Sequence, residues 1–365
     1  MLCPVFLVAQ EKTSAKLAAY MQAQADVNNF SGTVLVMKNG AILLKKAYGL
    51  ADYEWNIKNT LDTKFQLASV TKQFTAAAIL QLVDSGRLSL YDKLSKFFPD
   101  YPKADSISIH MLLSHSSGLA MGFKEIALSS ISRDSAYAAI KKIPFEFSPG
   151  AKSAYSNIGY YLLAKIIEKV SGEHYATFLK KNIFDKAGMK NTGVSNNESI
   201  VTKKAKVYYH NDQGFIHNPY INWEINLGHD GIYSTVEDLA IWDQTLYGTT
   251  ILSAAMKEKM FTPYISENWG YGFIINPFYN HGHYLIAHDG GFFGTMTSFN
   301  RFTDDKLFVT VLSNNGSASH IIGYGLSAIA FGKEVEMPYK HHRAKIDTTI
   351  YNNYVGEYGK IRILK

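Results

Sequence analysis

Short apolar runs at both ends of the chain predict a β-sheet that draws its strands from both termini. Near the start, apolar runs at residues 32–37 and 41–45 flank Asn39-Gly40, a pair that favours a tight hairpin turn. Helical periodicity occurs before the first strand, at residues 14–26, and after the last, at residues 321–330. Further strand-like runs lie late in the chain, at residues 270–275, 284–287, 295–299 and 307–312.

The long middle of the chain has a different pattern. From residue 69 to about residue 263, helical segments predominate, and turn signals such as Pro99-Asp100-Tyr101-Pro102 and Ser148-Pro149-Gly150 break them. Strand patterns thus lie on either side of a mainly helical stretch. We therefore predict one sheet domain that is built from both ends of the chain.

The first candidate for chemistry is Ser69, the only serine that stands three residues before a lysine, here Lys72. The pair opens a predicted amphipathic helix that stops at Gly86, and one helical turn brings both side chains to nearly the same face. A serine hydroxyl needs a neighbouring base to become a good nucleophile, and a desolvated lysine can act as one. The alternative is that Ser69 only caps the helix, as serine often does.

The second candidate is Tyr155-Ser156-Asn157, which lies between the turn at Pro149-Gly150 and the apolar helical run 161–167. A tyrosine and an asparagine two residues apart at such a junction can both project into one cleft. The same spacing also occurs at Tyr220-Ile221-Asn222 and Tyr351-Asn352-Asn353, so the pattern depends on its context.

The third candidate is His288-Asp289-Gly290-Gly291, which lies between two strand-like runs and predicts a glycine-rich corner between them. Glycines allow a substrate backbone to approach closely. A similar tripeptide, His229-Asp230-Gly231, precedes the helix-start signal Ser234-Thr235-Val236-Glu237-Asp238. Either tripeptide could be a simple turn.

In this order, the three candidates resemble the motifs of the serine β-lactamase-like and penicillin-binding hydrolase superfamily, in its class C and esterase branch. The resemblance covers about residues 12 to 332. Several other stretches resemble signatures of the same family, namely Leu112-Leu113-Ser114-His115-Ser116-Ser117-Gly118-Leu119, Tyr155-Ser156-Asn157-Ile158-Gly159-Tyr160, Gly231-Ile232-Tyr233-Ser234-Thr235-Val236-Glu237-Asp238-Leu239 and Val311-Leu312-Ser313-Asn314-Asn315.

The resemblance implies an α/β plus all-α fold, in which terminal helices flank an antiparallel sheet and a helical domain is inserted. On this interpretation, residues 11–68 and 264–332 form the sheet domain and residues 69–263 the mainly helical domain, with the active site in the cleft between them. Residues 333–365 form a C-terminal tail. Its segment Tyr351-Asn352-Asn353-Tyr354-Val355-Gly356-Glu357-Tyr358 resembles the first strand of a small β domain, so the tail is a stub, a truncated β segment or a strand on the main body.

The resemblance also implies roles for the motif residues. Ser69 is expected to attack a carbonyl and form an acyl-enzyme, while Lys72 and Tyr155 carry the proton to the leaving group and later help to activate water. Lysine and tyrosine have ordinary pKa values near ~10, so burial must lower the pKa of Lys72, or a cationic neighbour that of Tyr155.

Substrate binding falls to the remaining motif residues. Asn157 is expected to donate to a substrate amide or to Lys72, and His288 and Gly290 to line the site. The backbone N–H groups of Ser69 and Gly291 are expected to form an oxyanion hole.

His288 stands where relatives that destroy β-lactams efficiently commonly carry a lysine. A neutral histidine binds a substrate carboxylate less firmly than a permanent cation does. We therefore expect hydrolysis of carboxylic esters, or of D-amino-acid amides and peptides. One alternative is a β-lactamase or a penicillin-recognising sensor that is acylated but turns over slowly, and another is a degenerate, non-catalytic scaffold.

Composition argues against other classes of protein. The net charge of +6 comes mostly from dispersed lysines, without the basic cluster typical of nucleic-acid readers. The chain has no Gly-x-Ser-x-Gly elbow, no His-Glu-x-x-His pair, no set of cysteine ligands and no phosphate-binding loop. We expect no metal, no cofactor, no nucleic acid and no stable membrane span, and a small-molecule or peptide substrate.

The first ten residues, Met1-Leu2-Cys3-Pro4-Val5-Phe6-Leu7-Val8-Ala9-Gln10, resemble the end of a signal peptide that lacks its cationic start. This interpretation predicts an upstream start codon and a periplasmic or secreted bacterial protein, and the alternative is a short apolar arm. Cys3 is the only cysteine, so a mature protein would contain no disulfide. The sequence leaves the oligomeric state open.

Overall fold

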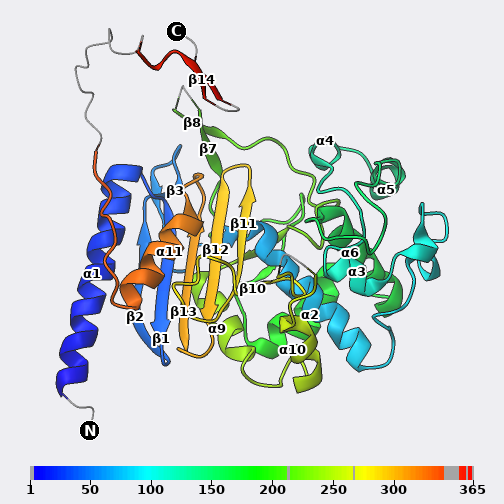
Figure 1. Cartoon of the computed structure of the whole chain (residues 1–365), viewed down its shortest axis with the longest axis horizontal. Coiled ribbons are helices and arrows are strands. Elements are labelled where there is room, and N and C mark those ends of the chain that lie inside the picture. Colours follow the sequence, from blue (N-terminus) through cyan, green and yellow to red (C-terminus); the bar gives the residue numbers. More distant parts are fainter. Residues whose placement is uncertain (1–3, 212–213, 266–267, 341–352, 359–360, 364–365) are drawn as a thin grey trace.

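A six-stranded antiparallel sheet forms the centre of the protein (Figure 1). The computed structural model describes residues 4–211, 214–265, 268–340, 353–358 and 361–363. The sheet has the order β10-β11-β12-β13-β1-β2, so that strand β1 from the start of the chain pairs with β13 from near its end. The strands are β10 (Ile274–Ile275), β11 (Leu285–Phe292), β12 (Thr295–Phe302), β13 (Leu307–Ser313), β1 (Gly32–Lys38) and β2 (Ala41–Tyr48).

This arrangement confirms the predicted antiparallel sheet from both termini. The turn between β1 and β2 is the predicted Asn39-Gly40, and both residues have the positive φ values (52° and 78°) that such a hairpin requires. Of the run at residues 270–275, only the end, Ile274–Ile275, forms a strand. Before it, Gly272 has φ 74°, and a Cβ on Gly272 would lie 2.7 Å from the Lys72 carbonyl oxygen. The backbone therefore turns at Gly272, where it passes close to the backbone of Lys72.

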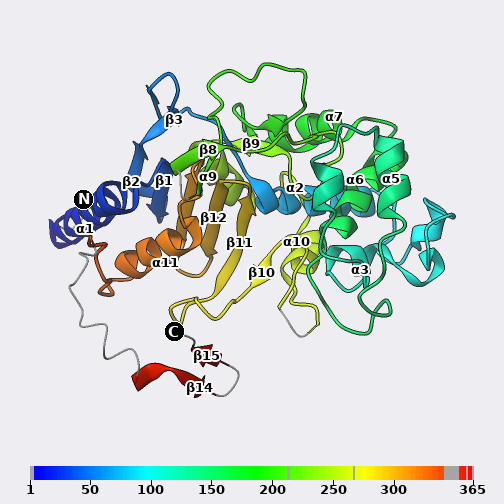
Figure 2. The same cartoon turned by 90° about the horizontal axis from the view of Figure 1, so that it is seen from above.

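Two helices cover one face of the sheet, α1 (Pro4–Asn28) and α11 (Ser319–Ala330) (Figure 2). Leu17 of α1 and Leu326 of α11 pack with Val34 and Val309 in one buried apolar cluster. Helix α1 is longer than the predicted 14–26 and includes part of the segment that resembles a signal peptide. Residues 1–3 lie outside the described residues, and no helix among those described is long and apolar enough to cross a membrane.

The other face of the sheet packs against the rest of the chain. Helix α9 (Val236–Thr245) lies against β1 and β13, and it begins at the predicted start signal, where the Thr235 side chain accepts a hydrogen bond from the Asp238 N–H. Successive side chains of a strand point to opposite faces of the sheet, which explains this arrangement. Val34 packs in the cluster that contains Leu17 of α1, whereas its neighbour Leu35 belongs to a second buried apolar cluster on the other face.

Helix α2 (Thr71–Asp84) runs through the middle of this second cluster. Eleven of its 14 residues are buried, so the prediction of an amphipathic helix is wrong. A helix with neighbours on every side needs no polar face. Its end is as predicted, because Gly86 follows the last turn with φ 72°.

The region between residues 69 and 263 is mainly helical, as predicted, and the fold class is confirmed. Its other helices are α3 (Ile109–Leu113), α4 (Lys124–Ala127), α5 (Arg133–Ile140), α6 (Asn157–Ser171), α7 (Tyr175–Leu179), α8 (Asp185–Ala187) and α10 (Ala254–Phe261), with a π-helix at Lys180–Phe184. Outside the tail, three small antiparallel sheets also occur among the described residues. Strand β3 (Leu50–Asp52) pairs with β4 (Ile57–Lys58), and β7 (Tyr208–Asn211) pairs with β8 (Gly214–His217). In the third sheet, β9 (Ile232–Ser234) lies between β5 (Phe65–Gln66) and β6 (Gly193–Val194). The exact domain boundaries stay a prediction.

The tail contains a short antiparallel strand pair, β14 (Gly356–Tyr358) and β15 (Ile361–Ile363). Residues 351–352, the start of the segment that resembles a β-domain strand, lie outside the described residues. The predicted β character of the tail therefore holds for residues 356–358 and 361–363.

Candidate active site

Ser69 lies in a 3-10 turn (Ala68–Val70) that leads directly into α2. Its side chain caps no helix, since α2 begins after Val70 without a side-chain capping bond. Instead, the Ser69 hydroxyl forms hydrogen bonds with Lys72 and Tyr155. The capping alternative is therefore wrong, and the structure brings the first two sequence candidates together.

Lys72 is fully buried, with its Nζ 3.0 Å from the Ser69 Oγ. The same Nζ donates to the His229 carbonyl oxygen at 3.0 Å and lies 4.7 Å from the centre of the Tyr155 ring. Burial lowers the pKa of Lys72 to about 7, and the nearby Asp230 carboxylate opposes this shift. Near neutral pH, a substantial fraction of Lys72 is thus an uncharged amine that can accept a proton.

Tyr155 donates a hydrogen bond from its Oη to the Ser69 Oγ at 2.6 Å. It stands just before α6, whose first turn is capped by the Ser156 side chain, which accepts from the Gly159 N–H. Burial raises the pKa of Tyr155 well above its ordinary value, against the effect of its bond to Ser69. The expected lowering by a cationic neighbour is not observed, and Tyr155 remains protonated.

Asn157 is the first residue of α6, and its backbone N–H donates to the Met121 carbonyl oxygen at 2.7 Å. Its Oδ1 is buried and has no hydrogen-bond partner among the described residues. The expected bond from Asn157 to Lys72 is not formed, since Lys72 donates to Ser69 and to the His229 carbonyl instead. The amide remains free to meet a substrate.

The third candidate, His288-Asp289-Gly290-Gly291, lies within strand β11 and pairs with residues 296–299 of β12. The predicted glycine-rich corner is therefore wrong, and the turn follows at Phe293-Gly294, where φ is 41° and 89°. Gly290 is needed for close packing, because a Cβ there would lie 2.3 Å from the Leu67 carbonyl oxygen and 2.2 Å from the Thr297 Oγ1. The strand thus abuts the segment that carries Ser69.

His288 is buried and uncharged. Its Nδ1–H donates to the Asp289 carbonyl oxygen at 2.6 Å. Burial, together with Lys72, lowers its pKa to about 3. The site therefore offers no permanent cation at the position where a lysine would bind a substrate carboxylate.

Sequence reasoning treated His229-Asp230-Gly231 only as a look-alike, yet it lies in the site. His229 accepts a hydrogen bond from Lys72 through its carbonyl oxygen, and its Nδ1 lies 3.0 Å from the Asp230 Oδ2. Both residues are buried. The only available signal was the match of the stretch that starts at Gly231 to a family signature.

His115 is a second residue that was missed as a contributor to the site, although it lies in a stretch that resembles a family signature. Its ring is buried, 4.7 Å from the Tyr155 ring and 4.8 Å from the Trp269 ring. Its Nδ1 accepts a hydrogen bond from the Ser156 N–H at 3.0 Å. His115 therefore helps to position Tyr155 and the start of α6.

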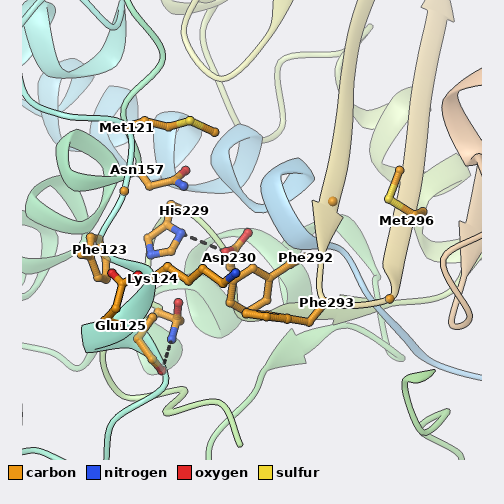
Figure 3. Close-up of a pocket in the computed structure, with 15 residues that line it drawn as sticks. Met121, Phe123, Lys124, Glu125, Asn157, His229, Asp230, Phe292, Phe293 and Met296 are labelled. Atoms are coloured by element: carbon orange, nitrogen blue, oxygen red, sulfur yellow. Dashed lines mark hydrogen bonds and ion pairs between the residues drawn. The ribbon is translucent and has the colours of Figure 1, made fainter. Parts of the chain in front are cut away.

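Two adjoining cavities open at these residues. The first, which we call the nucleophile cavity, has a volume of about 330 Å³ and is lined by Ser69, Tyr155, Asn157, Ile274 and 288–291 among others. The second, the side cavity, has a volume of about 670 Å³ (Figure 3). Both are lined by Met121, Asn157, Gly291 and Met296, so the two cavities lie side by side.

The residues present do not suggest a metal centre. Among the described residues, no group of three or more His, Cys, Asp or Glu side chains is placed to hold a metal ion. The serine, the lysine and the tyrosine are the groups that the structure joins by hydrogen bonds. Together with the sheet and the helical region, these residues have the geometry of a serine hydrolase.

Comparison with known proteins identifies the family. The family model described as Beta-lactamase matches residues 17–323, which is most of the chain. The chain therefore belongs to the β-lactamase family, and it is an enzyme of the serine hydrolase type.

Individual relatives agree with this assignment. Penicillin-binding protein 4* from Bacillus subtilis is 31% identical, and the match covers 94% of this chain and 82% of the relative. Teichoic acid D-alanine hydrolase from Staphylococcus aureus is 28% identical, with 82% and 73% covered. The solved structure of an octameric penicillin-binding protein homologue from Pyrococcus abyssi superposes with a TM-score of 0.78 at 28% identity, covering 93% of this chain and 80% of that one.

Proposed function

We propose that this protein hydrolyses carboxylic esters or D-amino-acid amides and peptides through an acyl-enzyme on Ser69. The observation that carries the proposal is the convergence of Lys72 Nζ and Tyr155 Oη on one serine oxygen, at 3.0 and 2.6 Å. A base is most effective when its pKa lies near the working pH. The pKa of about 7 for Lys72 meets that condition.

The two neighbours of Ser69 take different parts in the reaction. Neutral Lys72 accepts the hydroxyl proton as the Ser69 Oγ bonds to the substrate carbonyl carbon. Protonated Tyr155 gives its proton to the leaving oxygen or nitrogen as the old ester or amide bond breaks, and the lysine returns a proton to the tyrosine. Water then attacks the carbonyl carbon of the acyl-enzyme, with the proton transfers in the opposite direction. The bond to Ser69 breaks, and the free serine and the carboxylic acid are released.

The oxyanion of each tetrahedral intermediate requires fixed donors. We assign this role to the backbone N–H groups of Ser69 and Gly291. The close packing of Gly290 on the Leu67 carbonyl supports the assignment, because it holds the strand against the turn that carries Ser69. A single donor of this kind contributes about 3 kcal/mol to stabilisation of the transition state.

The choice of substrate rests on His288 and on the relatives. The neutral imidazole favours substrates without a carboxylate at that position, which disfavours β-lactams. One relative is, by its name, a hydrolase of D-alanine on teichoic acid. We extend this substrate chemistry, a D-aminoacyl ester or amide, to the present chain as part of the proposal.

The test uses purified protein and three substrates in parallel: a short-chain p-nitrophenyl ester, a D-alanyl p-nitroanilide and a chromogenic cephalosporin. We expect turnover of the ester or the anilide to exceed that of the cephalosporin, and Ser69→Ala to abolish it. Ser148→Ala, at an exposed turn, is the matched control. Full activity of Ser69→Ala would disprove the proposal.

A second candidate function has one observation in its favour, the 31% identity to a penicillin-binding protein. A sensor of this kind is acylated by a β-lactam but releases the acyl group too slowly for turnover. A stoichiometric burst with the cephalosporin, without steady-state hydrolysis of any substrate, would favour this candidate. The burst should disappear in Ser69→Ala.

We also propose that the enzyme acts outside the cytoplasm of a bacterium, on the basis of the apolar segment 1–10. Fractionation of bacterial cells that express the protein, with mass spectrometry of its N-terminus, tests this location. A cytoplasmic product with an intact first segment would contradict it.

A further inference from the structure

Four residues that line the side cavity each carry a buried acceptor atom without a donor. These atoms have no hydrogen-bond partner among the described residues, and they are Asn157 Oδ1, Asn226 Oδ1, His229 Nε2 and Asp230 Oδ1. In Figure 3 the His229 and Asp230 side chains lie between Asn157 and Phe292 in the view shown. Buried polar atoms are normally satisfied, so four of one kind on the residues around one cavity indicate that something with donors binds there.

The neighbours of these atoms show that they are acceptors. The Asn226 Nδ2 donates to the carbonyl oxygens of Asn222 and Ala127, at 2.8 and 3.3 Å, which directs its Oδ1 away from them. The His229 Nδ1 lies 3.0 Å from the Asp230 Oδ2, so Nδ1 carries the hydrogen and Nε2 offers a lone pair.

Asp230 adds a charge to this set. Burial raises the pKa of its carboxyl group, but the opposite effect of His229 and Lys72 is larger. The pKa of Asp230 is therefore below its ordinary value. The carboxylate is therefore ionised at neutral pH. The other charged side chains of the side cavity are Lys124 and Glu125, which are exposed and of opposite sign.

An ammonium group complements these features. It carries three donors, no acceptor and one positive charge, whereas a hydroxyl or an amide would bring a further acceptor. Phe123, Phe292 and Met296 supply apolar walls beside it for an attached hydrocarbon side chain.

The position relative to Ser69 restricts which ammonium group fits. The Lys72 Nζ lies 3.0 Å from the Ser69 Oγ and also 3.0 Å from the carbonyl oxygen of His229, the residue next to Asp230. The two cavities share Asn157 and Gly291. The residues that carry the acceptors thus adjoin the nucleophile cavity, which favours an amino group close to the reacting carbonyl, such as one on the α-carbon of an acyl group.

We propose that the side cavity is a subsite for the free α-ammonium group of an aminoacyl substrate, with Asp230 as its counter-ion. This inference rests on the proposed function and narrows its substrate class. N-acylation of the substrate removes the charge and two of the three donors, and it adds a carbonyl acceptor. The enzyme therefore selects aminoacyl esters or amides with an unblocked amino group over N-acylated peptides.

The kinetic test compares methyl esters of D-alanine, N-acetyl-D-alanine and propionic acid at neutral pH. Methyl propionate has the same skeleton as the D-alanine ester without the amino group, so the ratio of the two kcat/KM values isolates the ammonium contribution. We expect Asp230→Asn to lower this ratio by about 10- to 100-fold, the range of a hydrogen bond to a charged group. Any effect of Asp230 on Lys72 changes both rates and cancels in the ratio.

Glu224→Gln is the matched control, because it removes the same charge from an exposed residue that does not line the side cavity. It should leave the ratio unchanged. An unchanged ratio in Asp230→Asn, or a preference of the native enzyme for the N-acetyl ester, would overturn the ammonium subsite.

A binding measurement separates this inference from the proposed function. Calorimetry with the Ser69→Ala protein compares D-alaninamide and propionamide, which differ only by the amino group. We expect D-alaninamide to bind more tightly, and Asp230→Asn in the same background to remove the difference. Equal binding of both amides overturns the subsite even if Ser69-dependent hydrolysis is found, whereas selective binding supports it even if no ester is hydrolysed.

Discussion

The tripeptide His-Asp-Gly occurs twice, at residues 229–231 and 288–290, and its two copies behave differently. In the strand copy, His288 bonds to the backbone of its neighbour, and the Asp289 side chain lies near Ser298 and Tyr279. In the turn copy, the histidine ring bonds to the carboxylate of Asp230 itself. Identical letters thus produce two local structures.

The ionisation of the two aspartates differs accordingly. Burial raises the pKa of Asp289, and its hydrogen bonds do not reverse this shift. For Asp230, the effects of His229 and Lys72 exceed that of burial, and its pKa is lowered. Only the turn copy places a buried negative charge beside Lys72. The ionisation of each carboxylate therefore depends on its neighbours in space, which the tripeptide alone does not specify.

The largest expected effect concerns Lys72, which bonds to the turn copy and to Ser69. Lys72→Met removes the base, and we expect kcat/KM for the ester to fall by about 10²- to 10⁴-fold. Lys204→Met is the matched control. Burial also lowers the pKa of Lys204, to about 8, but its Nζ donates to Ser195. Equal losses in both variants would mean that any buried lysine matters, and would contradict the role of Lys72.

The next effect concerns the glycine of the strand copy. Gly290→Ala places a Cβ 2.3 Å from the Leu67 carbonyl oxygen, and overpacking of this kind costs about 1–3 kcal/mol of the free energy of unfolding. At Gly291 the same change meets only the flexible Met296 side chain, at 3.3 Å. Denaturant unfolding should show a smaller loss for Gly291→Ala, and equal losses would refute the close-packing argument.

A smaller effect is expected when the neutral histidine of the strand copy becomes a cation. His288→Lys should raise the ratio of kcat/KM for the cephalosporin to that for the ester, on the order of 10-fold, because a charged donor binds a carboxylate more strongly. The measurement is the rate on both substrates with the variant and the native enzyme. No change in the ratio would show that His288 does not contact the substrate carboxylate.

The smallest effect is a shift in the pH profile. The native kcat/KM should rise with pH and level off above an apparent pKa near 7, as Lys72 loses its proton. Asp230 raises the pKa of Lys72, so Asp230→Asn should move this rise to lower pH. Asp289→Asn should leave it in place. Identical shifts in both variants would remove the distinction between the two copies.

The sequence predicted the parts of the site that follow from local geometry. The proximity of Ser69 and Lys72 required only one helical turn. The positions of the strands along the chain required only apolar runs and a hairpin signal. The helix start at Thr235 was also readable, since a cap is a local hydrogen bond. These features depend on residues within a few positions of one another.

The features that sequence reasoning missed depend on distant neighbours. The burial of α2 on all sides, the contact between Lys72 and the His229 carbonyl, and the raised pKa of Tyr155 each require elements far apart in the chain. The glycines at 290–291 predicted a corner because glycine weakens strands, yet here close approach to Leu67 explains Gly290 within a strand.

The pairing of Gly32 with Ser313 has a consequence for how the protein folds. Strand β1 is synthesised before the helical region, but its partner β13 is made only after that region. Contacts of such long sequence separation slow folding. The residues of β11 that line the nucleophile cavity also follow the helical region, so a nascent chain without β11 lacks part of the substrate site. Hydrolytic activity should therefore be acquired only after β11 to β13 have been synthesised.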